Sequence, residues 1–335
     1  MALGCRLLAA IASVALLASS ACSEPSAVSK GDAPLVLERT IPLAGVAGRV
    51  DHLAIDPKRR ILFVAELGNG SVDAIDLGSG RSIGRITGLK QPQGLAFIPD
   101  ADELVVASGG DGSLRFYRGP DLTPAGLVQV GDDADNVRLD PATGHVVVGY
   151  GSGALAVIDP GRRVLLGTLA LPGHPESFRL HGDKAYVNVP GAKRIVVGDL
   201  RSGRVTASWT TPHFMNFPMA LSTAGDEVTV VFRLRAHLVT FDAASGKVKA
   251  DIETCGDSDD LFFDTSRRRF YVTCGSGSVD VVGVSPAGFS RIARIATRGG
   301  ARTSLFVPEL DRLFVAARAG SGSQGAAILV YRPSP

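Results

Sequence analysis

The sequence has almost no excess of charge of either sign. Its 335 residues include 35 Lys and Arg against 33 Asp and Glu, which leaves a formal net charge of +2. Proteins that bind nucleic acids usually carry a strong basic excess or a basic stripe on one face. The near balance of charge therefore argues against nucleic acid as a partner.

No serine or glycine-rich motif of the sequence stands in the structural context that nucleophilic or nucleotide chemistry requires. No Gly-x-Ser-x-Gly elbow lies at a strand-to-helix turn, where that motif would expose a catalytic serine. The glycine-rich runs at residues 151–153 and 275–277 are typical of hairpin turns, and no helix follows them as a phosphate-binding loop requires. We therefore expect neither a catalytic triad nor a nucleotide site.

Cysteine is scarce, with four residues in the chain. Cys5 and Cys22 belong to the N-terminal segment, which leaves Cys255 and Cys274. A cysteine pair without histidine at ligand spacing is weak support for zinc. In regular strands the pair would be separated by an intervening strand, too far apart for a bridge, but the flanking loops could bring the two together. The pair is therefore a disulfide, which an oxidising compartment favours, or two buried thiols, or thiols near a ligand.

Apolar runs that could enter a membrane are confined to the N-terminus. Residues 7–18 form a short apolar core behind Arg6, which is typical of a signal peptide over residues 1–21. Two processing routes fit: ordinary cleavage after the small residues 19–21, or a bacterial lipobox with Cys22 as the acylated residue. Residues 22–34 are polar and predict a flexible tether. We expect a periplasmic protein, or a lipoprotein of the outer membrane because Ser23 follows Cys22, with no other membrane contact.

Glycine is abundant, with 40 residues, as expected for a chain made largely of turns. A short apolar strand pattern recurs seven times at intervals of 40 to 49 residues. Its copies begin at Val72, Leu114, Leu155, Ile195, Leu238, Val279 and Ile328. A second apolar run precedes each copy, beginning at Ile61, Leu104, Val146, Ala185, Val228, Phe270 and Leu313. A repeat of roughly 40 residues with four strands in each unit is the signature of a β-propeller blade.

The clearest unit spans residues 250–283. It contains alternating runs at residues 251–254, 260–263, 269–273 and 278–282, separated by Gly, Asp and Ser turns. We interpret these runs as the first to fourth strands of one blade. The sequence therefore predicts an all-β protein, a seven-bladed β-propeller of four-stranded antiparallel blades over residues 35–335, with its first blade beginning at Leu35.

The candidate site follows from this architecture. The first strand of each blade lines the central channel, so the turns that leave the first strands should meet at one mouth of it. Asp and Pro turns repeat on the opposite face, which indicates a structural role there, whereas the residues at this mouth vary between blades. The candidate binding residues are Asp51, His52, Gln93, Asp133, Asp135, Asn136, His174, Glu176, Asn216, Asp259, Asp260 and Arg302.

Two functions fit these residues. The first is a non-catalytic scaffold, expected to be a monomer, that binds an unidentified small molecule or a periplasmic protein. The second is a hydrolase in which the acids and amides bind a divalent cation that activates water, a set similar to that of propeller lactonases. Alternatively, the acids only cap turns and pair with Arg138, Arg179 and Arg302.

Recurrent stretches also carry a family resemblance. They include Leu-Phe-Val-Ala at residues 62–65, Phe-Tyr-Val at 270–272 and Val-x-x-Ile-Asp at 72–76. Residues 131–138, 172–178, 216–220 and 300–310 look like one branch of the same family. Over residues 35–332 the chain resembles the YVTN-repeat, or YncE-like, family of bacterial extracytoplasmic propellers. The resemblance implies seven blades and an exported binding protein, and it supplies no catalytic motif.

Overall fold

The computed structural model of the protein describes Met1 and residues 33–320 and 324–335. The predicted signal peptide, Cys22 and most of the predicted tether lie outside the described residues. No helix among the described residues is long and apolar enough to cross a membrane.

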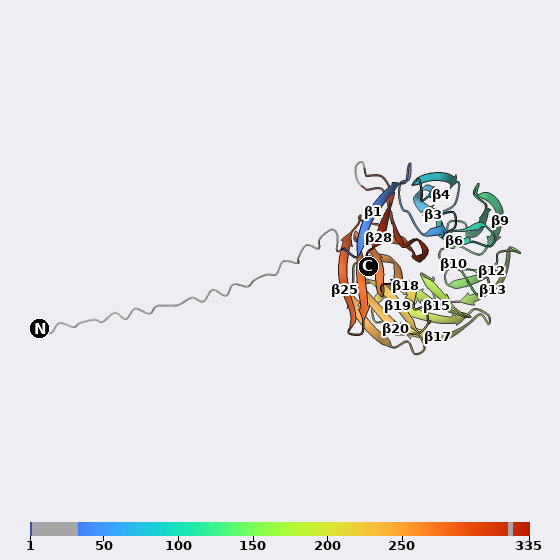
Figure 1. Ribbon diagram of the computed structural model, residues 1–335. Coiled ribbons are helices and arrows are strands. Elements are labelled where there is room, and N and C mark those ends of the chain that lie inside the picture. The colour runs from blue at the N-terminus through green and yellow to red at the C-terminus, as the bar shows by residue number, and fades with distance from the viewer. Residues whose placement is uncertain (2–32, 321–323) are drawn as a thin grey trace.

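The described chain forms seven four-stranded antiparallel sheets arranged as blades around a ring (Figure 1). The predicted all-β seven-bladed propeller is confirmed. The innermost strands are β2 (Leu53–Asp56), β6 (Pro92–Ile98), β10 (Val137–Leu139), β14 (Phe178–His181), β18 (Phe214–Leu221), β22 (Ser258–Asp264) and β26 (Thr303–Val307). The second strands are β3 (Ile61–Glu66), β7 (Glu103–Ser108), β11 (Val146–Tyr150), β15 (Lys184–Val189), β19 (Glu227–Leu234), β23 (Arg269–Cys274) and β27 (Arg312–Ala317).

The outer half of each blade completes the sheet. The third strands are β4 (Ser71–Asp76), β8 (Ser113–Arg118), β12 (Ala154–Asp159), β16 (Arg194–Asp199), β20 (His237–Asp242), β24 (Ser278–Ser285) and β28 (Ala327–Pro333). The outermost strands are β5 (Arg81–Ile86), β9 (Thr123–Gln129), β13 (Val164–Ala170), β17 (Arg204–Thr210), β21 (Val248–Glu253), β25 (Gly288–Ala296) and β1 (Leu35–Pro42). Three short 3₁₀ turns follow strands near the ends of the blades: η1 (Leu67–Asn69), η2 (Pro190–Ala192) and η3 (Pro308–Leu310).

The N-terminal strand closes the ring. Strand β1 pairs antiparallel with β28, so the last blade has the order β1-β28-β27-β26, and the two strands lie side by side in Figure 1. We number the blades one to seven from β2, with β1 as the outermost strand of blade seven. The predicted start of blade one at Leu35 is therefore wrong.

The predicted strand order within a blade is also displaced by one strand. The run at residues 251–254, interpreted as a first strand, overlaps β21, which is the outermost strand of the blade before it. A repeat has the same period wherever counting begins, so the sequence period does not reveal which strand lies innermost. Only the pairing of β1 with β28 determines at which strand each blade begins.

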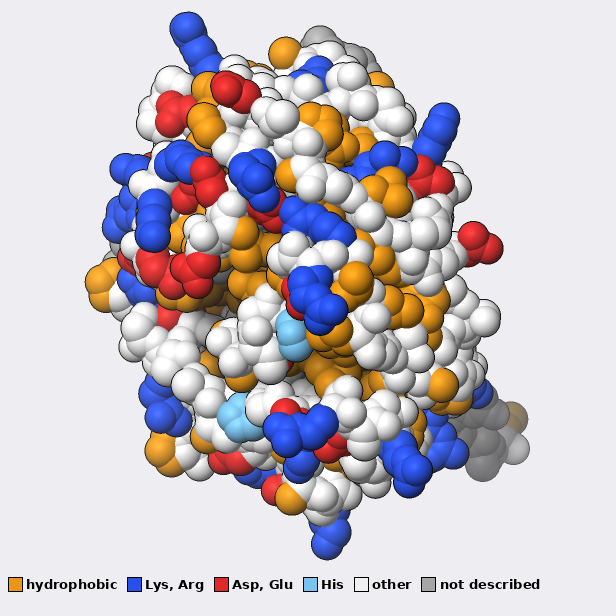
Figure 2. All heavy atoms as spheres, turned by 90° about the vertical axis from the view of Figure 1, so that its right-hand side faces the viewer, with side chains coloured by type: hydrophobic (Ala, Val, Ile, Leu, Met, Phe, Trp, Pro, Cys, Tyr) orange, Lys and Arg blue, Asp and Glu red, His pale blue; other side chains and the backbone are white. Residues whose placement is uncertain are grey.

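The core lies between the blades. Strands β3, β7 and β23 are buried at every residue because both faces of these strands pack against neighbouring blades. The outermost strands, such as β5, are mostly exposed. On the side of the molecule shown in Figure 2, basic and acidic side chains are interspersed.

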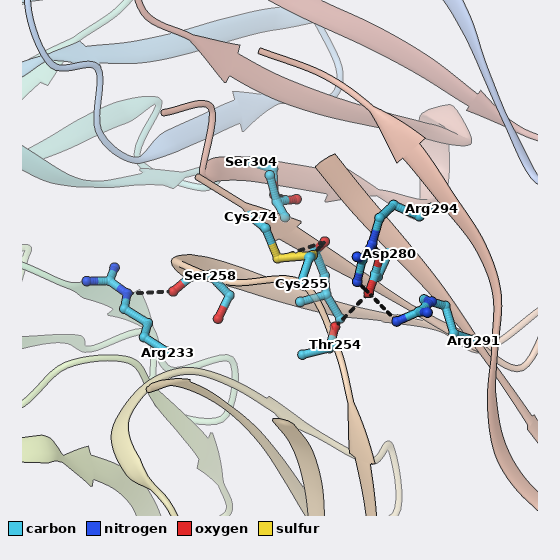
Figure 3. Close-up of a disulfide and its surroundings, with 11 residues drawn as sticks. Arg233, Thr254, Cys255, Ser258, Cys274, Asp280, Arg291, Arg294 and Ser304 are labelled. Atoms are coloured by element: carbon cyan, nitrogen blue, oxygen red, sulfur yellow. Dashed lines mark hydrogen bonds and ion pairs between the residues drawn. A yellow bond between two sulfur atoms is a disulfide. The ribbon is translucent and has the colours of Figure 1, made fainter. Parts of the chain in front are cut away.

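A disulfide joins Cys255 and Cys274 in blade six, with a Cα–Cα distance of 5.9 Å (Figure 3). Cys255 lies in the connection between β21 and β22, and Cys274 ends β23. No strand separates the two, because Cys255 precedes the innermost strand and lies over the end of β23. Next to the disulfide, Thr254 donates a hydrogen bond of 3.1 Å to Asp280. Both contacts attach the incoming chain to blade six.

Candidate binding cavity at the channel mouth

A cavity of about 280 Å³ opens at one mouth of the channel. All seven blades contribute to it, because the chain enters each innermost strand at this end. Its lining residues are Arg49, Asp51, His52, Gln93, Asp133, Asp135, Asn136, His174, Glu176, Ser177, Phe217, Arg233, Asp259 and Arg302. The lining is polar apart from Phe217, so the cavity suits a hydrophilic guest.

Three of the acids occupy equivalent backbone positions. The amide of Asp51 donates to Ala65 O at 2.7 Å, that of Asp135 to Gly149 O at 3.0 Å, and that of Glu176 to Asn188 O at 2.9 Å. Each acceptor lies on the second strand of the same blade. The sheet hydrogen bonding thus continues beyond the innermost strand and holds the three carboxyl groups at the mouth.

Gly94 is needed where blades two and three meet beneath the cavity. A Cβ atom at Gly94 would lie 1.9 Å from the carbonyl oxygen of Asp135. A contact that short between heavy atoms is forbidden, so any side chain there would push the Asp135 backbone away. The close approach of the two blades fixes the position of Asp135.

The three arginines of the cavity are already paired with acids. Arg49 Nη2 lies 2.7 Å from Asp51 Oδ2, in the geometry of an ion pair without an aligned hydrogen bond. Arg302 Nη1 donates to Asp257 Oδ1 at 2.8 Å.

Arg233 pairs with Asp259, and its Nε donates a hydrogen bond of 2.8 Å to the carbonyl oxygen of Ser258, the contact drawn in Figure 3. Its guanidinium also lies 3.5 Å from the centre of the Phe217 ring. This cation–π contact holds Arg233 over the apolar part of the lining.

Asp135 and Glu176 differ from Asp51 and Asp259, which are paired with arginines. Among the described residues, no Lys or Arg nitrogen lies within 4.0 Å of either carboxylate; the only basic side chain at that range of Asp135 is His52, with Nε2 3.7 Å from Oδ1. Asp135 Oδ1 accepts no hydrogen bond from the described residues, although Asp135 is only 8% exposed. Within the described part of the chain, these two carboxyl groups therefore have no Lys or Arg partner, and Asp135 Oδ1 also lacks a hydrogen-bond donor.

Burial changes the protonation of these groups. Burial, together with the nearby charges of Asp51, Glu176 and Asp259, raises the pKa of Asp135 well above its usual value. Burial and Asp259 raise the pKa of Glu176 to about 7. Burial and the charge of Arg138 lower the pKa of His52 to about 4. At neutral pH His52 is therefore neutral and Glu176 is partly protonated, so a cationic guest would favour the ionised form of Glu176.

Two predicted site residues do not line the cavity. Asn216 is buried between blades four and five, where Nδ2 donates to Asn188 Oδ1 at 3.0 Å and to Arg194 O at 2.9 Å. Asp260 Oδ2 accepts the backbone N–H of Ser304 at 2.7 Å and so links blades six and seven. Both residues join neighbouring blades instead of facing the cavity.

The other ten predicted residues lie in the cavity, and their role in binding stays a prediction. The list of candidate binding residues did not include Arg49, Ser177, Phe217 and Arg233. Arg49 stands two residues before Asp51, and Ser177 directly follows Glu176, so proximity in the sequence could have identified both. Phe217 and Arg233 meet only because β18 and the end of β19 converge in space.

The acids of the cavity do not form a ready-made metal cluster. Within residues 33–320 and 324–335, only one group of three or more His, Cys, Asp or Glu side chains has ligand atoms within 4.8 Å of one another. That group is His213, His237 and Asp251, none of which lines the cavity. The predicted pairing of acids with Arg138 and Arg179 is also not found among the described residues, where these arginines donate to Asn136 Oδ1 and Ser177 Oγ.

Comparison with known proteins shows the fold and no family. No protein-family model matches the chain, and no curated protein matches it significantly. A chain of Kuenenia stuttgartiensis hydrazine synthase is similar, with a TM-score of 0.73 and 17% identity over 87% of this chain and 99% of that one. A chain of a mitotic checkpoint complex is similar with a TM-score of 0.77 and 15% identity over 96% and 99%. At such identities the likeness establishes the propeller fold alone, which serves many unrelated functions.

Proposed function

We propose that this protein is a propeller scaffold that binds a small hydrophilic ligand in the channel-mouth cavity. The ligand presents ammonium or other hydrogen-bond-donating groups to Asp135 and Glu176. The observation that carries this proposal is the pair of carboxyl groups, Asp135 buried and Glu176 half-buried, that have no Lys or Arg partner among the described residues, beside three arginines that are already paired. Buried acceptors without donors are costly, so a ligand that supplies the donors gains binding energy.

The size and polarity of the cavity support a small polar guest over a large apolar one. Its volume of about 280 Å³ lies just below the usual range for small-molecule sites, roughly 300–1,000 Å³. The same geometry would accept a lysine side chain from a periplasmic protein. A metal-dependent hydrolase is less favoured, because the cavity acids are not clustered as ion ligands in the described residues.

Export is part of the proposal. The N-terminal segment has the pattern of a signal peptide with a lipobox at Cys22, and the chain resembles extracytoplasmic YVTN-repeat propellers. The Cys255–Cys274 disulfide supports an oxidising compartment such as the periplasm. We propose a monomeric periplasmic protein, held at the outer membrane when Cys22 is acylated.

The test uses small ammonium compounds and carboxylates of matched size as probes. Diamines, polyamines and amino sugars should raise the melting temperature of the wild type, and matched carboxylates should not. Asp135→Asn and Glu176→Gln should each weaken binding of the ammonium probes about tenfold, since each removes one charged acceptor. Asp100→Asn, an exposed acid on the opposite face, is the matched control.

Two results would count against the proposal. One is preferential binding of the carboxylates, and the other is equal binding of the ammonium probes by wild type and both variants. Lactone cleavage that chelator abolishes would instead support the metal-dependent hydrolase.

A further inference from the structure

A second group of side chains lies on blade five, outside the channel-mouth cavity. His213 directly precedes β18, His237 begins β20, and Asp251 lies on β21. Strands β20 and β21 are paired so that His237 faces Glu253 and Val239 faces Asp251. Because side chains alternate along a strand, His237 and Asp251 point to the same face of the sheet as diagonal neighbours. The chain entering β18 then places His213 over them.

The three side chains converge on one point. Asp251 uses both carboxylate oxygens, with Oδ2 2.9 Å from His213 Nε2 and Oδ1 2.6 Å from His237 Nδ1. The two imidazole rings stack with their centres 4.2 Å apart. All three ligand atoms lie within 4.8 Å of one another.

This spacing fits a metal ion. Ligand atoms bound to Zn²⁺ at about 2.0–2.2 Å stand roughly 3 Å apart, so small side-chain movements would place these three around one ion. Two imidazoles with one carboxylate are borderline ligands, which favour transition ions over Ca²⁺ or Mg²⁺. Three protein ligands leave coordination positions for water.

The surroundings hold the ligands and leave the site accessible. The rings of His213 and Phe232 meet edge to face, with their centres 5.4 Å apart. Thr211 Oγ1 donates a hydrogen bond of 3.0 Å to the carbonyl oxygen of His213. The side chains of His213, His237 and Asp251 are 16%, 25% and 34% exposed. The ligands are therefore positioned by packing, and an ion can reach them from solvent.

We propose that His213, His237 and Asp251 bind one divalent transition-metal ion, with Zn²⁺ the best match. The site shares no residue with the channel-mouth cavity, so it adds a function to the proposed ligand binding and does not depend on it.

The experiment titrates the full untagged chain, freed of metal, with Zn²⁺ by calorimetry and with Co²⁺ by visible absorption. We expect one ion per chain, d–d absorption bands from bound Co²⁺, and no comparable binding of Ca²⁺ or Mg²⁺. His213→Asn and His237→Asn should weaken Zn²⁺ binding at least 100-fold, and Asp251→Asn at least tenfold. His181→Asn, which changes an exposed histidine outside the triad, is the control and should bind as the wild type does.

Circular dichroism identifies variants that fail to fold, and the wild-type titration decides the question by itself in that case. No stoichiometric Zn²⁺ binding by the wild type would overturn the proposal. So would full binding by folded triad variants, because the ion would then lie elsewhere. A triad that only links strands would lower the melting temperature of the variants without any Co²⁺ bands in the wild type.

Discussion

The charge of single residues at the channel mouth depends on their partners as well as on residue type. Asp51 and Asp135 are both buried aspartates, yet Asp51 has Arg49 at 2.7 Å and Asp135 has only a neutral histidine nearby. Glu176 similarly lacks a basic partner. A propeller mouth brings acids from separate blades together, and each one raises the pKa of the others.

Glu176 makes the stability of the protein dependent on pH. Its pKa is about 7 in the folded protein against 4.5 ordinarily, so the folded state holds the proton more tightly than the unfolded state does. The contribution of that proton to the free energy of unfolding is fully present below pH 4.5 and is lost as the pH rises through 7. Glu176→Gln cannot lose a proton, so it should gain up to about 3 kcal/mol relative to wild type between pH 4.5 and 7.5.

Denaturant unfolding of both proteins across this pH range measures the difference. His52, with its pKa lowered to about 4, loses its stabilising contribution as the pH falls below 6.5, so only the difference between the curves isolates Glu176. Glu309→Gln, on the exposed η3 turn, should follow the wild type. Parallel curves for Glu176→Gln and wild type would show that the residue titrates normally.

At the scale of elements, the connections that enter the innermost strands carry the cavity. Each is attached to its own blade by backbone hydrogen bonds, as at Asp51, Asp135 and Glu176. Blade six adds a covalent attachment through Cys255 and Cys274. The connection therefore holds Asp259 near Arg233 without help from a ligand.

Removing the disulfide should destabilise the protein. Its cysteines are separated by 19 residues, and a crosslink closing a loop of this size stabilises by about 3 kcal/mol by restricting the unfolded chain. Cys255→Ser with Cys274→Ser should lower the free energy of unfolding by about that amount in urea. Reductant should have the same effect on wild type and none on the double variant. An unchanged urea midpoint after reduction would contradict the assignment.

At the scale of the whole molecule, the pairing of β1 with β28 makes the ring continuous. Ile41 on β1 is 2% exposed and packs with Phe314 and Ile328 of its own blade seven and with Leu62 of blade one. Ring closure thus joins residues from opposite ends of the chain in one core. Local loosening at this seam should spread to every blade, because each blade is packed on both sides.

Ile41→Ala should lower the free energy of unfolding by about 2–4 kcal/mol, since it opens a cavity in that seam. Leu37→Ala on the same strand should cost less than about 1 kcal/mol, because Leu37 is 50% exposed. Fluorescence of Trp209, the only tryptophan, reports from β17 in blade four, far along the ring from β1. The unfolding transition followed by this fluorescence should coincide with the transition followed by circular dichroism. A separate, earlier loss of β structure would mean that β1 detaches alone.

Local pattern was enough to predict the blades. Alternation of apolar residues and the turns between strands depend on neighbours in sequence, so seven repeats of four strands could be counted correctly. Which strand of each blade lies innermost could not be predicted from this pattern, because it depends on the pairing of β1 with β28, almost 300 residues away.

The candidate site divides in the same way. The sequence by itself determined the fold and the face on which polar residues gather, since the period places equivalent residues at one end of the channel. Tertiary structure decided which side chains enter the cavity. Register shifts between Asn216 and Met219 and between Ser258 and Asp260 turn Phe217 and Asp259 inward and leave Asn216 and Asp260 between blades. A bulge reverses the alternation on which a period-two prediction depends, so the sequence pattern alone does not reveal which side chains face the cavity beyond it.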